Sequence, residues 1–258
     1  MSKWINAIAT ITLGILILIT SVLLLALGFD LLVSSLMNIL APLIALFMGI
    51  LGIGFFGRES FLKEDRYQTL YAWIALGLVF FSLADVTTIL VSLAEDSVQI
   101  CYTIGLVQLP GLLLWVMGIL GYLRSLNSSL RLTEGTQLWL ALGIITTLTS
   151  LSLIVIFAII FPERYLLSTI VFVPIAVVLG LILCILFAIL WIFKEGLIAK
   201  PMLLLLFGVV LLFVRALFWQ IEGYCNGGSF GQILAIESYL LVGASFLIAN
   251  KIGIIFES

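Results

Sequence analysis

The stretch LSTIVFVPIAVVLGLILCILFAILWIF, from Leu167 to Phe193, decides the fold, because it runs for 27 residues without a charged side chain. A helix of about 20 apolar residues is long enough to cross the hydrocarbon core of a bilayer. Lipid offers no hydrogen bonds, and a helix satisfies its backbone donors and acceptors within one segment. The stretch is therefore predicted to be a transmembrane helix.

The rest of the chain has the same character. Hydrophobic residues make up 64% of the 258 residues and charged residues only 9%, whereas a soluble domain carries about 25% charged residues. We predict an all-α, polytopic integral membrane protein that forms a single membrane domain over residues 1–258. The eight predicted spans are Ile5–Gly28, Leu32–Phe56, Leu70–Leu93, Ile100–Leu123, Leu138–Phe161, Leu167–Phe193, Pro201–Ile221 and Gly231–Asn250. Seven spans, with two of these merged, is the alternative.

Basic residues predict the orientation of these spans. Of the 11 lysines and arginines, nine fall on one side of the membrane if all eight segments cross it. These nine are Lys3, Arg58, Lys63, Arg66, Arg124, Arg131, Lys194, Lys200 and Lys251, while Arg164 falls on the opposite side and Arg215 within a span. Loops rich in lysine and arginine stay in the cytoplasm. We therefore expect a multi-pass protein of the cell membrane with both termini cytoplasmic.

The two halves of the chain, residues 1–131 and 132–258, resemble each other weakly. Pro42 is echoed by Pro174, Gly77 by Gly208, and Gly14 with Thr20 and Ser21 by Gly143 with Thr149 and Ser150. With four helices in each half, both halves have the same orientation, and a pseudo-two-fold axis would lie along the membrane normal. The alternative is a chance likeness, because apolar helices share their composition.

Polar residues within the spans are the candidate site, because an ionisable group in the hydrocarbon is costly and normally has a partner or a function. Asp85 and Arg215 are predicted at similar depths and could pair across the pseudo-two-fold axis. Trp219 and Glu222 follow Arg215 on the same helix face. The full predicted cluster, in the outer half of the membrane or near its middle, is Asp85, Arg215, Trp219, Glu222, Glu237, Asn38 and Gln108.

Two interpretations of this cluster remain open. A buried structural network would fix which helix meets which, with Arg215 at its centre. A polar cavity open to the outside would instead bind a ligand, a lipid headgroup or an ion.

The cysteines and the missing histidine limit the chemistry. Cys101 and Cys225 are predicted at the outer surface, where disulfides persist, and could form a bridge; two free thiols is the alternative. Cys184 is predicted in mid-helix as an apolar filler. The chain has no histidine and no CxxC pair, so no metal or other cofactor is expected. No basic patch indicates nucleic acid as a partner.

The sequence therefore favours a non-catalytic membrane protein, a subunit or scaffold of a membrane complex. Its expected partners are the lipid bilayer and either other membrane subunits or further copies of itself. The alternative is a transporter or receptor for a small ligand or lipid that uses the cluster around Asp85 and Arg215. No hydrolase or phosphate-binding motif is found, so we do not expect an enzyme.

Overall fold

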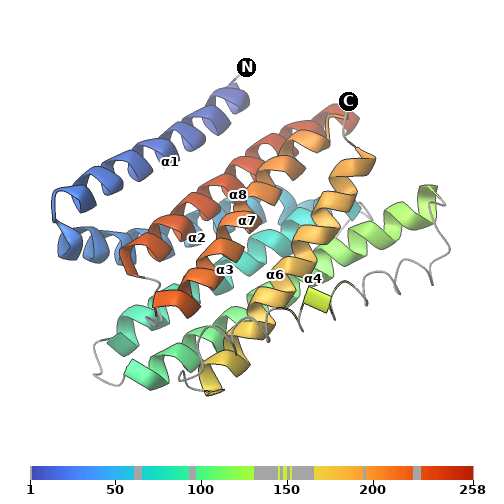
Figure 1. Cartoon of the computed structure of the whole chain (residues 1–258). Coiled ribbons are helices and arrows are strands. Elements are labelled where there is room, and N and C mark those ends of the chain that lie inside the picture. Colours follow the sequence, from blue (N-terminus) through green and yellow to red (C-terminus); the bar gives the residue numbers. More distant parts are fainter. Residues whose placement is uncertain are drawn as a thin grey trace.

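The chain is a bundle of long helices (Figure 1). The computed structural model describes residues 2–60, 66–92, 97–130, 145, 148–149, 152, 166–193, 196–222 and 228–257. Its helices are α1 (Ser2–Ala26), α2 (Asp30–Ser60), α3 (Arg66–Ser92), α4 (Ser97–Leu130), α6 (Leu166–Ile192), α7 (Ala199–Glu222) and α8 (Gly228–Glu257). Within the described ranges, 7 helices are long and apolar enough to cross a membrane. This is the architecture of a polytopic membrane protein.

Seven of the predicted spans coincide with helices of the structure, whose ends differ from the predicted ends by up to seven residues. The predicted span Leu138–Phe161 lies outside the described residues, apart from Ile145, Leu148, Thr149 and Ser152, which are helical. The count of eight spans therefore stays a prediction.

The helices run in two opposite directions. α2 is parallel to α8, because Met48 and Gly52 lie beside Gly243 and Phe246 in the same order. α1 is antiparallel to α8: Gly14 lies against Glu237, and Ala7 packs in one cluster with Leu247 and its neighbours. Figure 1 shows α4 and α6 running the same way as α8, and both ends of the chain at one end of the bundle.

α8 is the central helix and α1 the most peripheral. α8 packs against α1, α2, α3 and α7. Within the most apolar stretch of each helix, 89% of α8 is buried, against 11% of α1. A helix that is apolar on all sides needs either protein or lipid around it. α8 is surrounded by protein, and α1 presents most of its apolar surface outward.

α1 contacts the bundle along a narrow seam of small residues. Its buried positions among the described side chains are Ala7, Gly14 and Ser21, spaced by 7 residues. A seven-residue repeat keeps one side of a helix facing its partner, and small residues let the two backbones approach closely. Ser21 also lies against α2, where its Oγ is 3.9 Å from Met37 Sδ. The seam explains how so exposed a helix keeps a defined position.

The turn after α1 ends the helix at Ala26, two residues before the predicted end of the span. Gly28 has a φ of 82°, which favours glycine because it has no Cβ. The Phe29 amide donates to the Leu24 carbonyl and the Gly28 amide to the Leu25 carbonyl, both at 3.0 Å. This pair of hydrogen bonds is the Schellman motif, which satisfies the last carbonyls of a helix.

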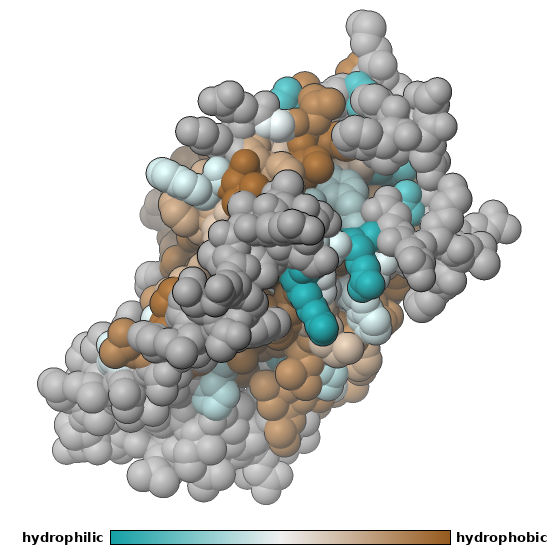
Figure 2. Space-filling view, turned by 90° about the vertical axis from the view of Figure 1, so that its right-hand side faces the viewer, coloured by the Kyte–Doolittle hydropathy of each residue, from teal (hydrophilic) through white to brown (hydrophobic). Residues whose placement is uncertain are grey.

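Basic residues gather at the end of the bundle that holds both termini. Arg66 begins α3, Lys200 lies in the first turn of α7, and Arg124 and Lys251 lie near the ends of α4 and α8. The helix directions place all four at this end, which we call the basic end. Seen from the right-hand side of Figure 1, the surface shows hydrophilic residues between apolar ones (Figure 2). The predicted one-sided distribution of charge therefore holds for these residues.

Candidate functional site

The centre of the site is a closed triad of buried polar side chains from three helices. Asp85 comes from α3, Arg215 from α7 and Tyr239 from α8. Arg215 Nη2 donates to Asp85 Oδ1 at 2.9 Å, Arg215 Nη1 donates to Tyr239 Oη at 3.1 Å, and Tyr239 Oη donates to Asp85 Oδ2 at 2.8 Å. Each member bonds both others, so the carboxylate has a partner at each oxygen.

The triad is almost fully removed from the surface. The exposed fractions are 2% for Asp85, 3% for Arg215 and 0% for Tyr239. At 1.5 Å per residue, Arg215 lies about 24 Å along α7 from its start at the basic end. The triad is therefore in the half of the bundle far from the basic residues. A buried ion pair is tolerated when each charge is paired and hydrogen-bonded, and the tyrosine supplies the additional hydrogen bonds.

Neighbouring side chains tie the triad helices to the rest of the bundle. Ser82, one turn before Asp85, donates to the carbonyl of Pro42 on α2 at 2.8 Å. Ser238, next to Tyr239, donates to the carbonyl of Gly208 on α7 at 2.8 Å. These bonds hold α2 against α3 and α7 against α8, and so fix the elements that carry the triad.

Beside the triad is a small cavity. Its volume is about 20 Å³ and its lining includes Gln108, Leu112, Arg215 and Tyr239. A space of this size holds about one water molecule. The predicted member Gln108 thus faces the same cavity as two members of the triad, from α4.

A larger groove lies on the other side of α6 and α7. Its volume is about 280 Å³, and Leu148, Thr149, Ser152, Ala176, Gly180 and Phe213 line it. None of these residues is charged. The groove is apolar apart from its two hydroxyl groups, and the triad does not line it.

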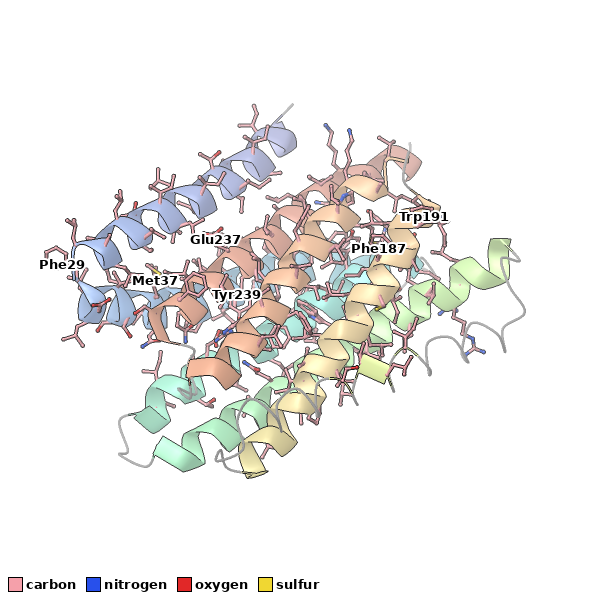
Figure 3. All side chains as sticks on the ribbon, viewed as in Figure 1. Phe29, Met37, Phe187, Trp191, Glu237 and Tyr239 are labelled. Carbon is pink, nitrogen blue, oxygen red and sulfur yellow. The ribbon has the colours of Figure 1, made fainter. Side chains whose placement is uncertain are left out.

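Glu237 is the predicted member that the structure places on another side of the bundle. Glu237 lies against Gly14 of α1, on the opposite side of α8 from Tyr239 (Figure 3). Asn38 is half-buried on α2, with Oδ1 buried and without a hydrogen-bond partner among the described residues. Trp219 and Glu222 belong to α7 by their backbone, but their side chains lie outside the described part. Stacking of Trp219 on Arg215 stays a prediction.

Tyr239 is the triad member that sequence reasoning missed. A tyrosine in an apolar helix carries no charge and does not stand out by composition. The available signal was its depth, because Tyr239 lies two residues from Glu237, a predicted member of the cluster.

The cysteine predictions stay largely untested. The side chain of Cys101 and all of Cys225 lie outside the described residues, so their bridge remains a prediction. Cys184 is a free, half-buried thiol on α6, in agreement with its interpretation as a filler. No group of three or more His, Cys, Asp or Glu side chains in the described ranges is placed to hold a metal ion.

Comparison with known proteins found no match: no family model, no curated protein and no solved structure matches this chain.

Proposed function

We propose that this protein is a non-catalytic scaffold or subunit of a complex in the cell membrane, with both termini in the cytoplasm. The observation that carries the proposal is the closed triad. Asp85, Arg215 and Tyr239 are hydrogen-bonded to one another, and the cavity beside them has room for about one water. Such a network fixes the packing of α3, α7 and α8 and leaves no space there for a solute.

The outer helices supply the surface that a subunit needs. Large apolar side chains on α1 are exposed along its whole length, among them Ile5, Leu13, Leu16 and Leu23, each more than half exposed. Lipid or another transmembrane helix covers a surface of this kind. The bilayer and either other subunits or further copies of this chain are therefore the partners we propose.

The packing of α2, α3, α4, α6, α7 and α8 supports a tandem repeat of four helices. Three contacts between helices have a counterpart four helices further along: α2 with α3 and α6 with α7, α3 with α4 and α7 with α8, α4 with α6 and α8 with α2. Gly77 lies against the carbonyl of Gly111 on α4, as Gly208 lies against that of Ser238 on α8. These relations support a pseudo-two-fold axis along the membrane normal.

The helix directions support an eighth crossing. α4 and α6 run the same way (Figure 1), so α4 ends at the basic end and α6 starts at the opposite end. The chain between Leu130 and Leu166 must return across the full length of the bundle. Four of its residues, Ile145, Leu148, Thr149 and Ser152, are helical, which supports a fifth helix here.

Native mass spectrometry of protein gently extracted from its host membrane tests the scaffold proposal. A reproducible mass that contains further polypeptides, or a second copy of this chain, is the expected result. A lone monomer with no polypeptide partner under all mild extraction conditions overturns the proposal.

The second candidate is a transporter or receptor for a lipid or small ligand. The apolar groove of about 280 Å³ favours it, because ligand sites are concave and mostly apolar with few polar groups. Protein in liposomes should then move or bind a labelled lipid by itself. The variant Gly180→Leu, which fills the groove, should abolish this activity, while Gly54→Leu on open surface should not.

A further inference from the structure

Glu237 lies in the membrane-spanning part of α8 and faces α1. Two residues of an α-helix are about 200° of rotation, so Glu237 and Tyr239 point to opposite sides of α8. Figure 3 places Glu237 in the space between α1 and α8. A Cβ atom on Gly14 would lie 2.6 Å from Glu237 Oε2, so the carboxyl group occupies the space that the missing side chain of Gly14 leaves.

No basic group is placed to neutralise this carboxyl among the described residues. The Oε1 atom is buried and has no hydrogen-bond partner in the same part of the chain. The sequence has no titratable residue from Asn6 to Ala26 on α1, or from Leu31 to Gly57 on α2. On the far side of α8, Asp85 and Arg215 are bonded to each other.

The remaining charged residues on α8 and the helices packed against it lie toward the helix ends. They are Lys3, Asp30, Arg58, Glu59, Arg66, Lys200, Glu222, Lys251 and Glu257. The side chains of Lys3, Arg58, Glu59, Glu222 and Glu257 are outside the described part. The tyrosines of α3, Tyr67 and Tyr71, lie near its start at the basic end. The surroundings of Glu237 on α1 and α2 are thus uncharged.

We propose that Glu237 is a proton-binding site within the membrane, and that the bound proton lets α1 close onto α8. An ionised carboxylate in lipid or in a dry helix contact is strongly unfavourable without a partner. The protonated acid is neutral and packs against the backbone at Gly14. When the proton leaves, the carboxylate requires water, and a movement of α1 away from α8 admits water to the buried Oε1 atom.

Loss of the proton from Glu237 is expected to move α1. It contacts the bundle mainly through α8, with few contacts to α2, along the seam of Ala7, Gly14 and Ser21. A ligand shifts a conformational equilibrium by its difference in affinity for the two states. Here the proton binds more tightly when α1 is closed, so acid favours the closed state. This inference goes beyond a scaffold role and does not depend on it.

A hydrophobic carbodiimide tests the proton site, because it forms a stable adduct with protonated carboxyl groups in apolar surroundings. The whole protein in phosphatidylcholine liposomes would be treated with dicyclohexylcarbodiimide over a range of pH, and adducts located by peptide mass spectrometry. We expect an adduct at Glu237 that declines severalfold as pH rises, and none at Asp85, whose two carboxylate oxygens are both hydrogen-bonded in the triad. Glu237→Gln should remove the adduct. Absence of an adduct at Glu237 at every pH, or a yield independent of pH, overturns the site.

A cross-link tests the movement of α1. In a background of C101S, C184A and C225S, the variants Ala7→Cys and Ile248→Cys place thiols in one packed cluster. The same cysteine pair is prepared with Glu237 and with Glu237→Gln. The disulfide yield of the Glu237 protein, divided by that of the Glu237→Gln protein, is followed with pH. This ratio should fall severalfold from acid to alkaline pH, and the comparison at each pH cancels the titration of the thiols. An equal yield in both proteins at all pH values overturns the coupling of the proton to α1.

Discussion

Arg215 Nη2 and Asp85 Oδ1 are 2.9 Å apart, although 130 residues separate them along the chain. The pair links α7 to α3, and therefore one predicted half of the chain to the other. Tyr239 closes the arrangement from α8. A single buried contact thus sets the relative position of helices that are distant in sequence.

Breaking this pair should destabilise the bundle strongly. Arg215→Met leaves the Asp85 carboxylate buried without its counter-ion, which costs about 3–5 kcal/mol. The double variant Asp85→Leu with Arg215→Met removes both charges and should lose less stability than the single variant. Unfolding in mixed detergent micelles measures both, with Arg124→Met, at an exposed position, as the control. A single variant as stable as wild type would contradict the structural role of the triad.

Close packing of α3 on α4 should make Gly77 intolerant of a side chain. A Cβ atom at this position would overlap the indole ring of Trp115 and lie 2.8 Å from the Gly111 carbonyl oxygen. Trp115 is fixed, since its Nε1 donates to the Ile74 carbonyl at 2.9 Å. Gly77→Ala should therefore lower the free energy of unfolding by about 1–3 kcal/mol.

Gly54→Ala is the matched control for this glycine. It lies in α2 with nothing within 4 Å of the added atom. Its stability should be unchanged or slightly raised, because alanine favours a helix more than glycine does. Equal losses for Gly77→Ala and Gly54→Ala would show that α3 and α4 pack less closely than these distances indicate.

The orientation of the bundle predicts which ends are reached from outside the cell. In the background C101S, C184A and C225S, a membrane-impermeant maleimide should label Asp30→Cys on intact cells. Arg124→Cys should react only after the cells are permeabilised, because it belongs to the basic end, which the positive-inside rule places in the cytoplasm. Both positions are exposed. The reverse pattern would show that the termini face outward.

The bridge between Cys101 and Cys225 should appear in peptide mass analysis without reduction. Alkylation before digestion should modify Cys184 alone, which is a free thiol, and a linked pair of peptides should contain the other two cysteines. Reduction should separate that pair. Recovery of Cys101 and Cys225 as alkylated peptides from unreduced protein would exclude the bridge.

The helices could be predicted from sequence because lipid imposes a simple requirement of length and apolarity. The end of α1 lies two residues before the predicted span end at Gly28, whose positive φ stops the helix. The pairing of Asp85 with Arg215 could be proposed because two opposite charges at one depth in lipid have few other partners.

The rest of the site could not be predicted. The sequence shows how deep a residue lies along a helix in the membrane, but in an apolar bundle it does not show which neighbouring helix that residue contacts. Glu237 and Tyr239 have almost the same depth, yet one faces α1 and the other α3 and α7. With apolar residues on every side of α8, no hydrophobic periodicity shows which face meets which neighbour. Grouping by depth therefore joined Glu237 to the wrong neighbours and left Tyr239 out.

The seam between α1 and α8 has a consequence for biosynthesis. α1 leaves the ribosome before every other described helix, and α8 after them, while α1 has little to pack against on α2. Through most of translation, α1 stands in the bilayer surrounded by lipid, stable there because of its own apolarity. Its docking onto α8 is therefore expected among the last steps of assembly, although α1 precedes the other described helices in the chain.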